Sequence, residues 1–227
     1  GVVSEYSCVK IHPDIPLDVA ALVGCGVPTG WGSSVYGAGV RAGDTVVIYG
    51  VGGVGINAVQ GAVYAGAKNV VAVDPVAFKR DTAARLGATH VVSDHEEARA
   101  LIVDGLTLGV GADHAVITMG VVTEEVVTAA VDTIRKGGDV TITGLGGVND
   151  RNIHLPSAAL TLFEKTIKGS LFGSGNPMYD IPKTLDLYQA GRIELDSLIT
   201  NRYKLDEVNQ AYADIEAGKN IRAMIIH

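Results

Sequence analysis

The sequence of 227 residues contains only two cysteines, Cys8 and Cys25. Two thiols are too few for the disulfide framework of a small secreted domain, and their scarcity favours a reducing compartment. The sequence also lacks a run of roughly 20 apolar residues that would span a membrane, and no charged-then-apolar signal segment begins it. We therefore expect a cytoplasmic protein that is not embedded in a membrane.

Long runs of charge of one sign are also missing, although the formal net charge is −7. Binding to nucleic acid or to an anionic membrane surface requires a basic patch, so we expect neither partner. The 29 glycines are spread without a period between apolar runs, which excludes a collagen-like chain and a flexible linker. Hydrophobic residues make up 47% of the chain, enough for one substantial core.

Short β-branched runs alternate with helix-length amphipathic segments from Thr45 almost to the end of the sequence. This alternation is typical of an α/β protein whose parallel sheet is covered by helices on both faces. Helices are predicted at about 54–65, 77–86, 96–106 and 124–136, three of them ended by Gly66, Gly87 and Gly137. The six predicted strands, the number in a doubly wound dinucleotide fold, are residues 45–49, 69–73, 90–92, 112–117, 139–143 and 166–171.

The two ends of the chain do not follow this repeat. Prolines interrupt regular structure near the start, yet the first residues, GVVSEYSCVKI, alternate like an interior strand. The tail predicts a helix over 205–217 and a strand over 222–226. Since the sequence opens on Gly1 instead of Met, we expect a portion of a longer protein, whose ends pack away from the main sheet.

The segment DTVVIYGVGGVGINAV places Gly50, Gly52 and Gly55 in the arrangement G-x-G-x-x-G, between a predicted strand and a predicted helix. The first glycine permits a tight turn, the second lets a pyrophosphate approach the backbone, and the third lets the helix lie close to the strand. The N-terminus of the helix offers N–H groups to phosphates. The motif alone fits a plain structural turn equally well.

Asp74 changes this balance, because it ends the next predicted strand, 19 positions after Gly55. A dinucleotide fold places a carboxylate there to bind the ribose hydroxyls of adenosine. The same charge repels a 2′-phosphate, and residues 75–77 supply no base, so NAD is favoured over NADP. Lys79 either reaches the ribose or is a solvated charge in the first turn of a helix.

Cys25 lies between two glycines in VGCGVPTGWGSSV. Free cysteines are most often buried and inert, and a catalytic zinc requires three protein ligands. Cys8 and His12 are the local candidates for the other two, although the strand-like pattern around Cys8 and the proline after His12 disfavour such a site. No ligand-like spacing is seen among the remaining histidines, which are His90, His95, His114, His154 and His227.

Several segments taken together resemble, in order and spacing, the zinc-dependent medium-chain alcohol dehydrogenases. They are GCGVPTGWGSSV, GVGGVGINAVQGA, VVAVDP, KGSLFGS and GKNIRAMIIH, and the likeness extends over nearly the whole chain. Details such as VDPVAFKR and LTLFEKTIKGSLFGSGNPMYDIP look most like the NDMA-dependent alcohol dehydrogenases of actinobacteria.

The resemblance implies a role for individual residues. Cys25 looks like one ligand of a catalytic zinc, and Thr29 like the catalytic-site residue beside the nicotinamide. The resemblance implies that NAD is bound at the pyrophosphate by Gly52, Gly53 and Val54 within the turn from Gly50 to Gly55, and at the ribose by Asp74 and Lys79. It further implies backbone contacts to the carboxamide from Thr143, Ser170 and Phe172, and a phosphate contact from Arg222.

The same resemblance implies three parts. Residues 1–30 look like a remnant of a catalytic domain and its link, 31–200 like the NAD-binding Rossmann domain, and 201–227 like a segment returning to the catalytic domain. Family members oxidise small alcohols to aldehydes, with hydride transfer to nicotinamide, and pair as homodimers through the edge strand at 166–171. Because Cys25 is the single zinc ligand here, we expect the chain alone to bind NAD without turnover.

Two alternatives stay open at this point. A zinc-free quinone or enone reductase of the same superfamily typically lacks a cysteine at the position of Cys25 and prefers NADPH, so Cys25 and Asp74 both argue against it. A non-catalytic module that binds a nucleotide is the second alternative, and an upstream domain bearing Cys and His ligands would distinguish it from an enzyme.

Overall fold

The computed structural model describes residues 2–147, 149 and 153–226, so Gly1 and His227 lie outside it. A six-stranded sheet forms its centre, with strand order β3-β2-β1-β4-β5-β6 and every neighbouring pair parallel. This order is that of the doubly wound dinucleotide fold and confirms the predicted fold class. Its strands are β1 (Thr45–Tyr49), β2 (Asn69–Val73), β3 (His90–Val92), β4 (Ala112–Ile117), β5 (Ile134–Ile142) and β6 (Thr166–Gly169).

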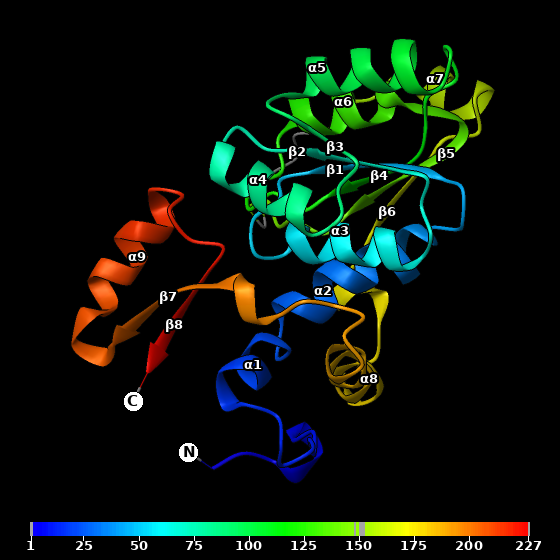
Figure 1. Cartoon of the computed structure of the whole chain (residues 1–227). Coiled ribbons are helices and arrows are strands. Elements are labelled where there is room, and N and C mark those ends of the chain that lie inside the picture. The colour runs from blue at the N-terminus through cyan, green and yellow to red at the C-terminus, as the bar shows by residue number, and fades with distance from the viewer. Residues whose placement is uncertain (1, 148, 150–152, 227) are drawn as a thin grey trace.

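Helices connect these strands, and a second, two-stranded parallel sheet follows them (Figure 1). The helices are α1 (Leu17–Leu22), α2 (Gly26–Gly32), α3 (Gly55–Tyr64), α4 (Ala77–Arg85), α5 (His95–Arg99), α6 (Glu124–Thr133), α7 (Ser157–Leu162), α8 (Pro177–Gln189) and α9 (Val208–Glu216). The small sheet consists of β7 (Ile199–Lys204) and β8 (Arg222–Ile226). Two π-helical segments continue α2 and α5, at Ser33–Ala38 and Ala100–Leu106.

Residues of β1 alternate between two hydrophobic cores, one on each face of the main sheet. Val46 and Ile48 pack with α3 in the first core, whereas Val47 and Tyr49 pack with α5 and α6 in the second. Such alternation follows from the two-residue period of a strand. Figure 1 shows α3 on one face of the sheet and α5 and α6 on the other. The sheet is therefore covered on both faces, as predicted.

The structure corrects the boundary between α6 and β5. The sequence predicts a helix through residue 136 and a strand from 139, but α6 ends at Thr133 and β5 begins at Ile134. Ile134 is buried and extended because it pairs with Ala112 of β4, with a register irregularity before His114. Gly137 adopts a φ of 69° inside this strand, so its predicted role as a helix cap is wrong.

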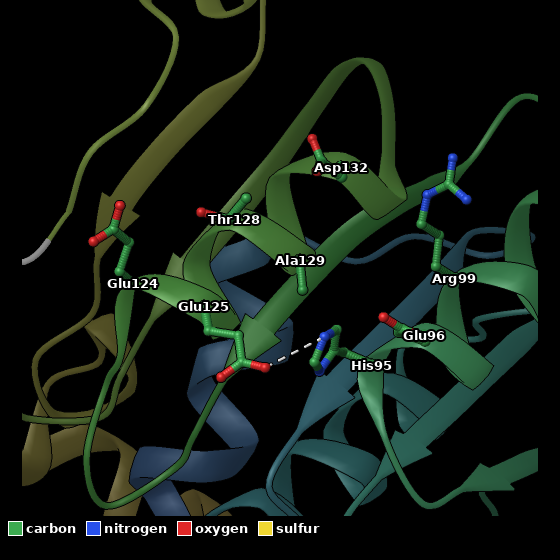
Figure 2. A pocket seen from close by; sticks show the side chains of 8 residues that line it. All are labelled: His95, Glu96, Arg99, Glu124, Glu125, Thr128, Ala129 and Asp132. Atoms are coloured by element: carbon green, nitrogen blue, oxygen red, sulfur yellow. Dashed lines mark ion pairs between the residues drawn. The ribbon is translucent and has the colours of Figure 1, made fainter.

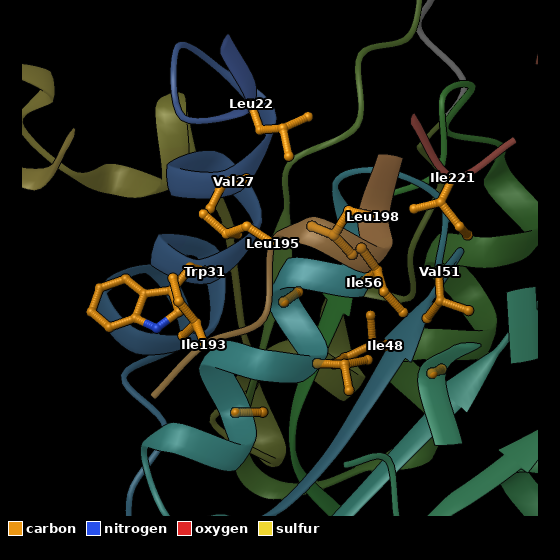
Figure 3. Packing of buried hydrophobic residues seen from close by; sticks show 14 of the residues in the cluster. Leu22, Val27, Trp31, Ile48, Val51, Ile56, Ile193, Leu195, Leu198 and Ile221 are labelled. Atoms are coloured by element: carbon orange, nitrogen blue, oxygen red, sulfur yellow. The ribbon is translucent and has the colours of Figure 1, made fainter. Parts of the chain in front are cut away.

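Both ends of the chain contribute to the first core, contrary to the expectation that they pack away from the main sheet. Leu22 near the start and Ile221 in the tail belong to the same buried cluster as Ile48 and Ile56, part of which is drawn in Figure 3. The strand expected over the first residues is also wrong. A strand needs a hydrogen-bonded neighbour, and no described strand pairs with residues 2–11, which contain a short 3₁₀ turn at Glu5–Ser7.

The tail forms a 3₁₀ turn at Leu205–Glu207, then α9 and β8, in agreement with the predicted helix and strand. Asp18 of α1 accepts a hydrogen bond from Arg202 of β7 at 2.7 Å, so the two ends of the chain also contact each other. Within the described part of the chain, no helix combines the length and the apolar character needed to cross a membrane.

Candidate functional site

The glycine-rich turn lies between β1 and α3, where the sequence places it. Gly50 has a φ of 84°, a conformation that glycine adopts without strain, and its N–H donates to the carbonyl oxygen of Val73 at 2.8 Å. A Cβ on Gly55 would lie 1.8 Å from the carbonyl oxygen of Gly50. Both glycines are therefore required by the close approach of strand and helix.

The N–H groups of Gly52, Gly53 and Val54 point from this turn without a hydrogen-bond acceptor among the described residues. They directly precede α3, whose dipole places positive charge at this end. A Cβ on Gly52 would meet one atom only, Nζ of Lys79 at 4.0 Å. The turn therefore offers open space, unpaired donors and a nearby ammonium group, the requirements of a phosphate site.

Asp74 follows β2 and is buried, with 5% of its surface exposed. One carboxylate oxygen accepts from the N–H of Val51 at 3.0 Å, and the other accepts from the N–H of Val76 at 2.9 Å. These bonds fix the carboxylate beside the glycine-rich turn. Gly50, Gly52, Asp74 and Lys79 all line one pocket of about 430 Å³.

Arg80 was not identified from the sequence. Its guanidinium donates to the carbonyl oxygens of Asp74 and Pro75, at 2.7 and 2.9 Å. The arginine therefore fixes the loop after β2 from its position on α4. A basic residue one turn into the helix that follows the aspartate was the available signal, but sequence alone does not show which carbonyl groups such a side chain meets.

Arg222 of β8 reaches the glycine-rich turn from the tail. Its Nη2 donates to the carbonyl oxygen of Gly53 at 3.0 Å. Cβ atoms on Gly26 and Gly53 would lie 1.6 and 2.4 Å from the guanidinium, so only glycine leaves room for it at either position. Burial lowers the pKa of Arg222, although the nearby Cys25 opposes this effect.

Cys25 immediately precedes α2 and is exposed, so the interpretation as a buried, inert thiol is wrong. Its carbonyl oxygen accepts from Oγ1 of Thr29 at 2.7 Å. No group of three metal-binding side chains occurs among the described residues, which removes the local site of Cys8, His12 and Cys25. A zinc ion held by Cys25 would require ligands from outside these residues.

The residues matched to the carboxamide contacts lie at the carboxyl ends of β5 and β6. The N–H of Thr143 donates to Ile117 at 2.9 Å, and the N–H of Ser170 donates to Ile142 at 2.8 Å. Ser33 links this region to α2, because its hydroxyl lies 2.6 Å from the carbonyl oxygen of Thr29 and 2.7 Å from Oγ1 of Thr143. Ser33 thereby brings Thr29 and Thr143 together.

Phe172 opens a 3₁₀ turn, Phe172–Ser174, directly after the carboxyl end of β6. Gly173 in this turn approaches α2 so closely that a Cβ would lie 2.4 Å from the carbonyl oxygen of Pro28. All predicted site residues therefore border α2, α4 or the carboxyl edge of the main sheet. In open α/β sheets that edge is where ligands bind.

A second pocket of about 600 Å³ lies outside this group, between α5 and α6 (Figure 2). His95 pairs with Glu125 across it at 3.6 Å, and both residues also line the pocket at the glycine-rich turn. None of the predicted site residues lines this second pocket. His114 lies elsewhere, held by Asp139 and Asp44 at 2.8 and 3.1 Å, in a structural role.

Comparisons with known proteins agree with this geometry. The chain is 58% identical over its whole length to the NDMA-dependent alcohol dehydrogenase of Amycolatopsis methanolica and spans 61% of that protein. Benzyl alcohol dehydrogenase from Acinetobacter calcoaceticus superposes with a TM-score of 0.87 at 32% identity, over 96% of this chain and 59% of that one.

Another solved structure, a zinc-binding dehydrogenase from Sinorhizobium meliloti 1021 bound to NADP, superposes with a TM-score of 0.82 at 27% identity, over 96% of this chain and 61% of that one. The chain thus spans about three fifths of the length of the proteins it matches. The model of the zinc-binding dehydrogenase family matches residues 53–190. Since this match covers more than half of the chain, from the end of the glycine-rich turn through β2 to the end of α8, the chain belongs to the zinc-binding dehydrogenase family.

Proposed function

We propose that this chain is the NAD-binding portion of a zinc-dependent alcohol dehydrogenase, which oxidises a small alcohol to an aldehyde by hydride transfer to nicotinamide. One observation carries the proposal. Three N–H groups without an acceptor among the described residues, at the start of α3, occur in the same site as the fixed carboxylate of Asp74. A dinucleotide needs both features, the first for its pyrophosphate and the second for its ribose. The relative from Amycolatopsis methanolica is an NDMA-dependent alcohol dehydrogenase.

NAD is the cofactor that this pocket favours. Each oxygen of Asp74 accepts a backbone N–H and keeps a lone pair for a ribose hydroxyl. A 2′-phosphate would lie against this buried negative charge. Arg80, which follows Asp74 on α4, is not free to balance it, because its guanidinium already donates to two carbonyl oxygens of the same loop. The neighbour from Sinorhizobium meliloti binds NADP, so the choice of nucleotide needs a direct test.

The chain's own residues have distinct roles in this proposal. The N–H groups of the glycine-rich turn bind the pyrophosphate, Asp74 and Lys79 bind the adenosine ribose, and Thr29 lies beside the nicotinamide. Cys25 provides one thiolate to a zinc ion whose other ligands come from the remainder of the enzyme. When bound, zinc lowers the pKa of the alcohol hydroxyl, and NAD accepts the hydride.

The terminal segments and the edge strand complete the proposal. Residues 1–30 and 201–227 join residues 31–200 to a catalytic domain, in a cytoplasmic enzyme. β6 lies at an edge of the main sheet, and Leu162 and Leu171 beside it are 75% and 86% exposed. An exposed edge and apolar side chains favour pairing, so two copies form a homodimer through β6.

Leu171→Lys tests the dimer by sedimentation equilibrium. We expect it to shift the chain toward the monomer, because a charge would be buried in the interface. Leu108→Lys is the matched control, since Leu108 is 89% exposed on a loop distant in sequence. Equal association of both variants would exclude pairing through this edge.

Calorimetric titration of the purified chain with NAD, followed by assays with zinc and a primary alcohol, tests the main proposal. We expect NAD to bind and turnover to be absent, because the described residues offer no complete set of zinc ligands around Cys25. No binding of NAD or NADP would contradict the nucleotide site, and sustained turnover would contradict the need for a catalytic domain.

A further inference from the structure

Phe172, Gly173 and Ser174 adopt three successive positive φ angles, of 51°, 68° and 57°. Residues other than glycine rarely adopt this region, because a Cβ crowds the backbone there. A turn of this kind persists only where its surroundings determine it. The contacts that hold Phe172–Ser174 therefore decide where its backbone points.

One side of the turn rests on α2. A Cβ on Gly32 would lie 2.5 Å from the carbonyl oxygen of Gly173, so the two backbones touch with no side chain between them. The hydroxyl of Ser174 also donates to that of Ser170 at 2.9 Å. These contacts fix the start of the turn and leave its exit, at Gly175 and Asn176, to other groups.

Asp180 of α8 holds that exit. Its Oδ2 accepts from the N–H of Asn176 at 2.6 Å, while its own N–H donates to the carbonyl oxygen of Asn176 at 2.7 Å. A Cβ on Gly175 would lie 2.6 Å from the same carboxylate oxygen. Asp180 is buried, with 5% exposed, so its negative charge needs partners in the protein.

Tyr36 and Lys183 supply these partners. The hydroxyl of Tyr36 donates to Oδ1 of Asp180 at 2.8 Å, and Nζ of Lys183 donates to the same hydroxyl oxygen at 2.8 Å. The Lys183 ammonium also lies 5.3 to 5.6 Å from three ring centroids, those of Trp31, Tyr36 and Tyr179. Lys183 is half-buried, and cation–π contacts at this distance help to hold its ammonium in place.

Tyr36 belongs to the π-helical segment Ser33–Ala38, which also contacts the other two carboxamide positions. Ser33 bonds to Thr143, and a Cβ on Gly37 would lie 3.2 Å from Oγ of Ser170. One short segment therefore touches Thr143, Ser170 and, through Asp180, the turn at Phe172. A shift of this segment would move all three together.

We propose that Tyr36, Asp180 and Lys183 form a positioning relay, which holds the backbone of Phe172–Ser174 toward the nicotinamide ring. The inference rests on the proposed function, because it assumes that NAD occupies the pocket. None of the three touches the cofactor in this arrangement. Each acts through the backbone between Phe172 and Asn176, so the relay affects the nicotinamide half of NAD and not the adenosine half.

The affinities for NAD and for ADP-ribose distinguish an effect on the nicotinamide half of the cofactor from one on the adenosine half, because ADP-ribose lacks the nicotinamide ring. Tyr36→Phe removes only the hydroxyl and keeps the ring beside Trp31. We expect it to weaken NAD binding by about fivefold or more, the effect of one lost hydrogen bond to a charged group, while ADP-ribose binding changes less than about twofold. Lys183→Met keeps the apolar stem, and the same split is expected.

Tyr188→Phe is the matched control. Tyr188 lies near the other end of α8 and donates to the carboxylate of Asp196, so it loses a similar bond far from the turn. We expect neither ligand to change. Equal losses for NAD and ADP-ribose in the Tyr36 and Lys183 variants, or no loss in either, overturn the relay. Failure of the parent chain to bind ADP-ribose instead overturns the proposed function itself.

Discussion

Arg222 donates from Nη2 to the carbonyl oxygen of Gly53 at 3.0 Å and thereby joins β8 to the glycine-rich turn. The guanidinium lies over two glycines, Gly26 and Gly53, so the last strand, the turn and the start of α2 meet at one side chain. This contact connects the small sheet to the cofactor site. Removing this contact therefore measures how much the tail contributes to the free energy of unfolding.

Arg222→Met keeps an apolar stem and removes the guanidinium. We expect the free energy of unfolding to fall by about 1–3 kcal/mol, because a half-buried hydrogen bond from a charged guanidinium is lost, although Nδ2 of Asn57 still donates to the carbonyl of Gly53. Urea unfolding measures the change. Arg202→Met, which breaks an exposed ion pair with Asp18, should cost less than about 1 kcal/mol. Equal losses would show that Arg222 has no special role.

Asp74→Asn tests nucleotide choice. An amide cannot accept at both of its polar atoms, so one of the two backbone N–H donors, of Val51 or Val76, loses its partner. We expect NAD affinity to fall about tenfold or more, and the preference for NAD over NADP to shrink, as the repulsive charge is removed. Calorimetric titration with both nucleotides measures this. Asp81→Asn, at an exposed carboxylate on α4, should leave the preference unchanged.

Gly55→Ala tests the close approach of α3 to β1. The new Cβ would lie 1.8 Å from the carbonyl oxygen of Gly50 and 2.5 Å from Oγ1 of Thr118. Because backbone must move, we expect a loss of stability of at least about 1–3 kcal/mol. Gly105→Ala is the control, since its Cβ would meet one side-chain carbon at 3.9 Å. A thermally stable Gly55→Ala variant would contradict the described turn.

His114 predicts a pH dependence of stability. Burial lowers its pKa, but hydrogen bonds and charge from Asp139 and Asp44 outweigh this and raise the pKa above the ordinary value of 6.5. A raised pKa in the folded state means that the stabilisation is complete below pH 6.5 and is lost as pH rises through the folded value.

Urea unfolding at pH 6 and pH 8 tests this, with less stability from His114 expected at pH 8. In His114→Gln that part of the pH dependence should disappear, whereas His154→Gln, which changes an exposed side chain, should keep it. An unchanged slope in His114→Gln would assign the effect to other groups.

Much of the fold was readable from the sequence because local patterns and tertiary structure agree. The limits of β1 and β2 match the predicted ones, since each is a short run rich in β-branched residues and buried along its whole length. Ile134 shows where the local pattern fails. Helical periodicity continues past it, but pairing with Ala112 in β4 determines its extended conformation.

The candidate site, like the fold, was predicted from the sequence only in part. The positions of Gly50 and Gly55 follow from a local motif, whereas the bond between Tyr36 and Asp180 joins residues 144 positions apart. No periodicity connects such residues, because only the packing of α8 against α2 brings them together. Arg80 is an intermediate case. It is near Asp74 in sequence, but it bonds to backbone carbonyl groups, and because every residue has such a group the sequence does not identify the partner.

Gly53 and Arg222 are 169 positions apart, so a ribosome adds Arg222 to the chain well after Gly53. At about 5–20 residues per second, a ribosome adds Arg222 roughly 10–30 s after Gly53. Throughout that interval the turn lacks the guanidinium that lies against its carbonyl. A nascent chain therefore acquires its finished cofactor site late, and a nucleotide that binds the completed turn would favour full-length molecules over those interrupted during translation.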